Sequence, residues 1–401
     1  MSDRIIVVGA GQAAASLVAK LRGEGHKGPV TVIGAEPAPP YQRPPLSKKY
    51  LLGEMETERL YLRPESWYSE NDVETRLGAV VQEVDRGAKE VVLNGGTRLG
   101  YAKLALTTGS VPRRLPAAIG GDLAGLFTVR DLSDVDRMAP EFTEGRRVLI
   151  IGGGYIGLEA AAVAASKGLR VTVVEMAERI LQRVAAPATS DFIRALHHSH
   201  GVEIREGVGL VRLEGEGRVS RAVLTDESDV EIDFAIIGIG IMPDIGLAEA
   251  ADLEIENGIK VDQYSRTSDP DIYAAGDCAS FPYRGVRIRL ESVPNAIDQG
   301  ENAALNMLGR DEEYIAKPWF WSDQYDMKLQ IAGLNAGWDE TITRPGAKEG
   351  TQSVWYFKGD QLLAVDAMSD ARSYMIGKRV IEAGGTLPKS DVADPEVKLK
   401  P

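Results

Sequence analysis

Two segments of this chain share the same order of sequence features, and this order is compatible with few folds. Each has an aliphatic run, a glycine-rich turn, an alanine-rich helical stretch and a second aliphatic run that ends near an acidic residue. This is the order of a βαβ unit in which a helix N-terminus faces a pyrophosphate. The segments are RIIVVGAGQAAASLVAKL with PVTVIGAEP, and RRVLIIGGGYIGLEAAAVAASKG with LRVTVVEMAE. The sequence therefore predicts two dinucleotide sites.

The first unit contains a GxGxxA motif. Gly9 permits the tight turn, Gly11 lets the backbone approach the pyrophosphate, and Ala14 stands where a third glycine often allows close helix packing. Glu36, at the end of the second strand, is placed to accept hydrogen bonds from the adenine-side ribose. A simple glycine turn would also give the motif alone. Strand, helix and acidic residue occur in register here, which favours a binding site.

The second unit carries the full GxGxxG motif. We expect Gly152, Gly154, Ile156 and Gly157 to contact the cofactor, and Glu175 ends the second strand. A carboxylate at that point accepts from both ribose hydroxyls and repels a 2′-phosphate. The sequence therefore predicts NADH in preference to NADPH.

Length and charge narrow the class of protein. With 401 residues the chain has material for two or three cores. A formal net charge of −13 argues against nucleic acid and anionic membrane surfaces as partners. Its apolar runs are interrupted by glycine and charge, and no secretory leader pattern is visible, so we expect no membrane span and a cytoplasmic location.

Cysteine and histidine usage excludes two kinds of redox or metal centre. Cys278 is the only cysteine, so the chain has no internal disulfide and no cysteine pair. We expect it to be a small buried packing residue. The four histidines show no metal-ligand spacing, so no metal site is predicted.

Two further runs resemble the glutathione-reductase-like flavoproteins. In TSDPDIYAAGDCA, the resemblance implies that Asp277 binds the ribitol chain of FAD and that Gly276 allows close approach. LTTGS is similar to the crossover strand of that fold, which adds Thr108 and Gly109 to the FAD site. The alternative for Asp277 is a strand-end residue that caps the next turn. The order of elements implies FAD on the first unit and NADH on the second.

Three more runs narrow the resemblance to the oxygenase-coupled ferredoxin reductases. They are PYQRPPLSKKYL, ESVPNA and PWFWSDQYD. This family implies FAD, NADH, a small [2Fe-2S] ferredoxin and, behind it, a cytochrome P450 or related oxygenase. The alternatives are a monodehydroascorbate or rubredoxin reductase, and an apoptosis-inducing-factor-like flavoprotein that acts through protein interactions.

The absence of a cysteine near the expected flavin site indicates, apart from any resemblance, where the electrons go. Related disulfide reductases place a reactive cysteine in the helix expected to begin near PPLS, where this chain reads SKKYL. Without a thiol, the reduced flavin must deliver electrons outward, to a docked protein, a diffusible acceptor or oxygen. By resemblance, Lys48 in this stretch and Glu159 form an ion pair near flavin N5 and are the catalytic candidates. The alternative is a domain-spanning salt bridge with no kinetic role.

Several other residues are expected around the flavin. A helix from about Pro294 should direct its N-terminal amides, around Val293 and Ala296, at flavin N1 and the C2 carbonyl. Trp321 is expected over flavin and nicotinamide, although core packing is an equal alternative. Arg43 and Pro44 are expected to wall the flavin, with a surface loop as the alternative.

A ferredoxin would have to dock on a local basic patch of this acidic chain. For each candidate cation taken alone, an ordinary surface charge is the favoured alternative, since charged residues cover any soluble protein. The candidates are Arg63, Arg310, Lys328, Arg344, Lys378 and Arg379.

The predicted fold is therefore α/β, of the glutathione reductase type, with two Rossmann-like domains and a C-terminal α+β domain. We expect an FAD domain from 1–111 and 241–317, an NADH domain from 112–240 and a C-terminal domain from 318–401. The last residues, rich in Lys, Asp and Pro, are expected to form a solvated tail.

Overall fold

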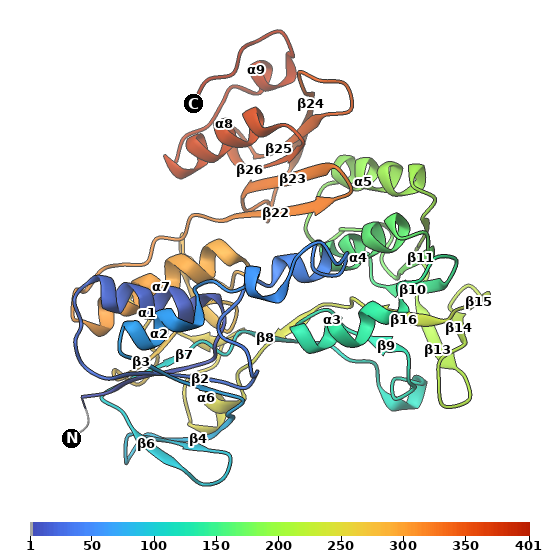
Figure 1. The fold of residues 1–401 in the computed structure, drawn as a ribbon. Coiled ribbons are helices and arrows are strands. Elements are labelled where there is room, and N and C mark those ends of the chain that lie inside the picture. Colours follow the sequence, from blue (N-terminus) through green and yellow to red (C-terminus); the bar gives the residue numbers. More distant parts are fainter. Residues whose placement is uncertain (1–2) are drawn as a thin grey trace. The chain divides into compact units, whose positions relative to one another are not determined.

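The computed structural model describes residues 3–401, which form two compact units (Figure 1). The first unit contains residues 3–43, Glu56–Val111 and Met242–Pro318. The second contains Pro44–Met55, Pro112–Ile241 and Trp319–Pro401. Both predicted nucleotide-binding segments are present, one in each unit. The predicted NADH and C-terminal domains fall in one unit, so the three-domain division stays a proposal.

A five-stranded parallel sheet organises the first unit. Strands β1, β2 and β19 are apolar and buried, whereas the edge strand β3 is partly exposed, and helices α1 and α7 pack against the sheet. Gly300 of α7 allows a close helix contact, since a Cβ there would lie 2.6 Å from the carbonyl oxygen of Ala13. The sheet order is β19 (Ile272–Ala274), β7 (Lys103–Leu106), β1 (Ile5–Val8), β2 (Val30–Gly34) and β3 (Val73–Leu77), with α1 at Gln12–Gly23, α2 at Glu65–Glu70 and α7 at Val293–Met307.

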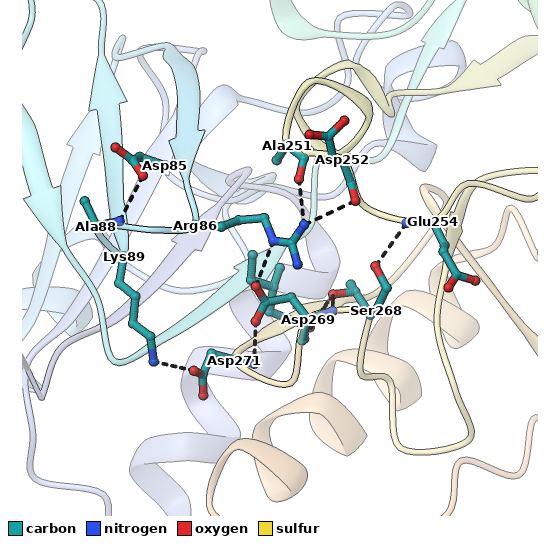
Figure 2. A network of polar contacts seen from close by, with 12 residues as sticks. Asp85, Arg86, Ala88, Lys89, Ala251, Asp252, Glu254, Ser268, Asp269 and Asp271 are labelled. Atoms are coloured by element: carbon teal, nitrogen blue, oxygen red, sulfur yellow. Dashed lines mark hydrogen bonds and ion pairs between the residues drawn. The ribbon is translucent and has the colours of Figure 1, made fainter.

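An antiparallel meander adds a second layer to this unit. Figure 2 shows how Arg86 anchors it: its guanidinium contacts the Asp269 carboxylate at 2.8 Å and the carbonyl oxygens of Ala251 and Asp252, each at 3.2 Å. Lys89 pairs with Asp271, directly before β19. The network thus holds the segment that leads into Asp277. The remaining elements are β4 (Val81–Asp85), β5 (Glu90–Leu93), β6 (Arg98–Gly100), α6 (Gly246–Ala250), β18 (Ile259–Lys260), β20 (Ala279–Tyr283) and β21 (Val286–Ile288).

The second unit contains another five-stranded parallel sheet. Strand β10 runs into a glycine turn and helix α4, and then into β11, which pairs with β10 from Arg147↔Arg170 to Ile151↔Val174. The sheet order is β12 (Glu203–Glu206), β11 (Arg170–Glu175), β10 (Arg147–Ile151), β16 (Phe234–Ile237) and β9 (Leu126–Phe127). Also present are α3 (Leu132–Met138), α4 (Tyr155–Ser166), α5 (Pro187–Ser199) and the meander β13 (Leu210–Glu214), β14 (Arg221–Leu224) and β15 (Asp229–Glu231). Strands β8 (Ser110–Pro112) and β17 (Ile241–Pro243) span the chain crossings between units.

The same unit includes an antiparallel C-terminal sheet. Its strand β25 is buried on both faces. Trp355 and Phe357 pack on α8, whereas Tyr356 faces the cluster that contains α5 residues. The sheet order is β22 (Trp319–Gln324), β23 (Met327–Gly333), β26 (Gln361–Met368), β25 (Gln352–Lys358) and β24 (Glu340–Pro345), with α8 at Ala371–Glu382 and α9 at Lys389–Ala393. Among the helices in residues 3–401, none has the length and apolar character that crossing a bilayer requires.

The stretch after Arg43 begins as the 3-10 helix Pro44–Ser47, where a helix was expected, and continues as irregular turns. It does not become regular, because the amides of Lys48 and Tyr50 both donate to the Pro45 carbonyl. The prediction of a solvated C-terminal tail was wrong, because two of its apolar side chains are buried. Val392 has no exposed surface, and Leu399 is 7% exposed.

Arg344 explains the packing of this C-terminal segment. Its guanidinium donates to the carbonyl oxygens of five residues, which are Asp391, Val392, Asp394, Pro395 and Val397, at 2.6 to 3.1 Å. The whole residue is 9% exposed. Arg344 is therefore a structural clamp, and its prediction as a docking cation was wrong.

We expect Arg344→Ala to lower the free energy of unfolding by about 2–4 kcal/mol, because five carbonyls lose a charged donor that is itself buried. Arg344→Lys should recover little, since an ammonium cannot reproduce the planar fork. Urea unfolding followed by circular dichroism measures the loss. Lys358→Ala, at an exposed position on β25, is the control, and equal stability of the Arg344→Ala and Lys358→Ala variants would contradict the clamp.

A buried carboxylate joins β26 to α5. Asp366 Oδ2 accepts from Thr189 Oγ1 at 2.8 Å and from the Tyr356 hydroxyl, while Oδ1 is buried with no partner in the described chain. Burial raises the pKa of Asp366 to about 6. The folded state therefore binds this proton more tightly than the unfolded state does.

Because the folded pKa is raised, the stability that Asp366 contributes is present at low pH and is lost as pH rises through about 6. Asp366→Asn should flatten the stability curve between about pH 4 and 7 and raise stability at pH 8 by at most about 3 kcal/mol. Thermal unfolding across pH measures this, with the exposed Asp360→Asn as control. An unchanged slope would contradict the assignment.

Candidate functional site

The first glycine turn, residues 9–11, leaves open space for a ligand between the end of β1 and the start of α1. We call this space the first cradle. Gly9 has φ +106°, and a Cβ there would lie 2.2 Å from the Thr107 carbonyl oxygen, so no other residue fits. Gly11 caps α1 without a side-chain hydrogen bond, and nothing lies within 4 Å of its Cβ position. Ala14 is fully buried. The N-terminus of α1 thus has open space at the Gly11 Cβ position, which is the room that an approaching pyrophosphate requires.

Glu36 lies beyond the end of β2 and is held by two side chains. Arg43 forms an ion pair with its Oε1 at 2.6 Å, and the Tyr41 hydroxyl donates to its Oε2. The structure thus places Arg43 beside the carboxylate predicted for the adenine-side ribose. Tyr41 was missed, and no sequence signal indicated it. The guanidinium and hydroxyl orient the carboxylate but leave lone pairs for a ribose.

Asp277 lies in a polar setting after β19. Its Oδ2 accepts from Ser110 Oγ at 2.9 Å. Gly276 has φ +84° beside the Cβ of Ala13, so the chain passes close to α1. On the crossover segment, Thr108 Oγ1 donates to the Asp244 carbonyl at 2.6 Å, and the Gly109 carbonyl accepts from the Asp244 amide.

The N-terminus of α7 offers fewer donors than predicted. Ser292 is the N-cap, and its Oγ accepts from the Asn295 amide at 3.3 Å. The Ala296 amide donates to the Ser292 carbonyl at 3.0 Å, as the fourth residue of any α-helix does. Pro294 has no N–H. Of the two amides predicted to face the flavin, only that of Val293 is outside the intrahelical pattern.

The second glycine turn, residues 152–154, leaves a similar space before α4 in the second unit. We call it the second cradle. Gly152 has φ +108°, and a Cβ there would lie 2.4 Å from the Gly238 carbonyl oxygen. A Cβ on Gly157 would lie 2.3 Å from the Gly152 carbonyl oxygen. Gly154 caps α4 without a side-chain bond and has open space at its Cβ position, and Ile156 is 43% exposed.

Glu175 ends β11, and the glycine turn orients it. Its Oε2 accepts from the Gly153 amide at 2.7 Å, and its Oε1 accepts from the Ala177 amide at 2.8 Å. Two backbone donors therefore fix the carboxylate at the edge of the cradle without neutralising it. This suits the predicted ribose contact.

Lys48 and Glu159 form an ion pair within the second unit. Lys48 Nζ lies 3.0 Å from Glu159 Oε1 and 3.9 Å from an Asp323 carboxylate oxygen. Ser47 Oγ donates to Glu159 Oε2 at 2.6 Å, and Ser322 Oγ donates to Oε1 at 2.7 Å. Burial raises the pKa of Glu159, which the Lys48 ammonium opposes. Ser47 and Ser322 were missed, because nothing in a single sequence brings β22 beside α4.

The aromatic run stacks within itself, and the cysteine is buried. Trp321 stacks on Trp319, with ring centroids 5.5 Å apart, and is partly buried. Pro44 begins the 3-10 turn of the second unit. Cys278 has no exposed surface, as predicted, and burial raises the pKa of its thiol.

Two dinucleotide cradles of this kind, each at the end of a parallel strand, define a nucleotide-dependent oxidoreductase with two cofactors. Residues 3–300 match the family of pyridine nucleotide-disulphide oxidoreductases, and residues 319–401 match the reductase C-terminal family. The chain belongs to the pyridine nucleotide-disulphide oxidoreductase family. The predicted fold class is thereby confirmed.

Individual relatives cover almost the whole chain. A ferredoxin–NAD(P)(+) reductase of Sphingomonas sp. is 41% identical, covering 99% of this chain and 96% of that protein. Rhodocoxin reductase of Rhodococcus erythropolis is 37% identical, covering 99% and 93%. The reductase in the crystal structure of a covalent putidaredoxin reductase–putidaredoxin complex matches with a TM-score of 0.94 and 36% identity, covering 98% and 96%. The resemblance to the ferredoxin reductases is thereby confirmed.

FAD and NADH are the cofactors of this chain, and the two cradles fit them. Gly11 and Gly154 leave room where any side chain would project, and both helix N-termini lack side-chain caps. A carboxylate stands beside each cradle, Glu36 at the first and Glu175 at the second. These are the elements that dinucleotide binding needs.

Replacing the second carboxylate should change cofactor preference. Glu175→Ser is expected to lower kcat/KM for NADH about tenfold to a hundredfold, because charged hydrogen bonds to the ribose are lost, and to affect NADPH much less. Steady-state kinetics with both cofactors measures the ratio. The control is Glu203→Ser on β12, which pairs with Arg205. A wild-type kcat/KM for NADPH equal to or above that for NADH would contradict the predicted preference.

Proposed function

We propose that this protein is an NADH-dependent ferredoxin reductase, in which the first cradle would hold FAD, the hydride acceptor, and the second would hold NADH, the hydride donor. Electrons then pass singly to a [2Fe-2S] ferredoxin that serves a cytochrome P450 or related oxygenase. The observation that carries the proposal is the missing thiol. The chain has one cysteine, and it is buried, so no dithiol can accept electrons within the protein.

When bound, FAD supplies the conversion between a two-electron hydride donor and one-electron acceptors. The chain's own residues bind and orient the two dinucleotides. Gly11 and Gly154 admit the pyrophosphates, Glu36 and Glu175 hold the riboses, and Asp277 holds the ribitol chain. We assign Lys48 and Glu159 to the hydride-transfer step, as a cation whose position a buried carboxylate maintains.

The proposed docking surface for the ferredoxin is a basic face of α8. Arg372 and Arg379 lie on the same side of this helix as Met375, which is 44% exposed. With Lys400 they line a hollow of about 300 Å³. On a chain of net charge −13, such a local cluster can attract an acidic protein that the rest of the surface repels. We call it the α8 basic face.

The cations that the sequence suggested for docking have different surroundings in the structure. Arg379 belongs to the α8 basic face, and Lys378 lies beside it over the Trp319 ring while pairing with Glu382 at 3.6 Å. Arg310 is 3.4 Å from Glu24, and Arg63 stacks on Trp67. Lys328 is exposed and stays a candidate.

The test is NADH-driven cytochrome c reduction with and without a panel of [2Fe-2S] ferredoxins, at several salt concentrations. We expect one ferredoxin to raise the rate by orders of magnitude at low salt, and the gain to fall as salt screens docking. If none does while rubredoxin, monodehydroascorbate or quinones turn over rapidly, the partner is wrong and the acceptor is identified instead. Slow turnover with every acceptor would favour a redox-dependent interaction protein.

Charge reversal tests the α8 basic face. Arg372→Glu with Arg379→Glu should raise KM for the ferredoxin about tenfold and weaken its salt dependence, because charge pairs at the interface are lost. Ferricyanide reduction should not change. The control is Arg98→Glu, an arginine with half its side chain exposed (51%) on β6. An unchanged KM in the double variant would contradict this docking surface.

A further inference from the structure

A line of buried polar side chains leads away from the Lys48–Glu159 pair. Ser322 and Gln324 lie two residues apart on β22, so they share one face of the strand, and neither has any exposed surface. Gln324 Nε2 lies 3.2 Å from Ser322 Oγ, and Gln324 Oε1 lies 2.8 Å from His197 Nε2 on α5. His197 Nδ1 lies 3.2 Å from the Tyr325 hydroxyl.

The ionised carboxylate dictates the direction of every bond in this line. Glu159 can only accept, so Ser322 donates its one proton to it and can only accept from Gln324. The amide nitrogen of Gln324 must therefore face Ser322, and its oxygen must face His197.

The same logic sets the imidazole. His197 must carry its proton on Nε2 to donate to Gln324, which leaves Nδ1 to accept from Tyr325. Burial lowers the pKa of His197 to about 4, so the ring is neutral as this arrangement requires. All four donors point towards Glu159, and such aligned bonds strengthen one another.

The backbone at the far end is held in an unfavourable conformation. Tyr325 begins the two-residue turn between β22 and β23, and its φ of +55° is uncommon for any residue but glycine. Its ring stacks on His200, with centroids 3.6 Å apart, and meets the His197 ring edge-on at 5.2 Å. The packing of α5 thus holds Tyr325 where its hydroxyl reaches His197.

We infer that Tyr325, His197, Gln324 and Ser322 form a one-way donor chain that fixes the Glu159 carboxylate for Lys48. They are positioning residues for hydride transfer, and this consequence rests on the proposed function. The donor chain does not conduct protons. If Gln324 accepted a proton on Oε1 and released one from Nε2, its amide would be left as the unstable imidic acid tautomer. The charged and titratable groups around it are Lys48 and Asp323 at one end and His198 and His200 at the other.

Nitrogen NMR of the histidine-labelled holoprotein tests the direction of the chain. The protein has four histidines, so assignment by single replacements is practical. We expect His197 to be neutral with its proton on Nε2. A proton on Nδ1, or a charged ring at neutral pH, would overturn the inference on the unaltered protein.

Ser322→Ala tests whether the two ends are linked. Removing the hydroxyl frees Gln324 to turn, so the His197 signals should lose the single Nε2–H pattern. The matched control is Ser353→Ala, which removes a buried serine on β25 that accepts from Trp355 Nε1 and should leave His197 unchanged. Unchanged His197 signals in the folded Ser322→Ala variant would overturn the chain.

Stopped-flow flavin reduction by NADH across pH tests the consequence. We expect His197→Leu to slow reduction about threefold to tenfold and to move the acidic loss of rate to higher pH, because a carboxylate whose Ser322 donor is less firmly held protonates more readily. His197→Gln, which keeps an N–H donor, should recover most of the rate.

Equal pH midpoints in wild type and His197→Leu would overturn the positioning role. Lys48→Ala distinguishes a failure of the ion pair's role in hydride transfer from a failure of the donor chain. If that variant reduces its flavin at the wild-type rate, the assignment of the ion pair to hydride transfer fails, whereas the NMR result still decides whether the donor chain exists.

Discussion

A carboxylate inside a protein stays charged only where donors surround it, and Glu159 is 5% exposed. Its partners come from two separate stretches of the second unit: Ser47 and Lys48 from the turn after Arg43, and Ser322 from β22. Helix α4 therefore cannot hold this charge without the C-terminal sheet beside it. Compensation of the buried Glu159 charge thus requires contact between the second glycine motif and β22, which lies more than a hundred residues later in the chain.

The two glycine turns obey a different constraint, which is space. Gly9 and Gly152 have positive φ and lie against carbonyl oxygens that any Cβ would strike, whereas Gly11 and Gly154 face nothing. The first pair brings the backbone close, and the second leaves room for a ligand. Because both demands act over a few residues, they are visible in the sequence as a motif.

The prediction of a solvated tail failed because it depended on contacts that no local pattern records. Arg344 has no unusual neighbours in the sequence, yet it binds five carbonyls of a segment that composition marked as solvated. The stretch after Arg43 begins as the expected helix, in 3-10 form at Pro44–Ser47, but it does not continue, since its backbone bonds follow no single spacing. The Ala296 amide was expected to face a ligand, but a position that far into the helix donates within it.

The sequence by itself determined the two βαβ units, both cradles, the acidic residue beside each and the absence of a redox thiol, because these follow from the order and spacing of neighbouring residues. Only the tertiary structure decided which partners surround Glu159, how Tyr41 and Arg43 hold Glu36, and how Gln324 and His197 line up behind Ser322. The sets at Glu159 and behind Ser322 join residues that lie far apart in the chain, so packing and the compensation of buried polar groups select them. The set at Glu36 depends on the conformation of the loop after β2.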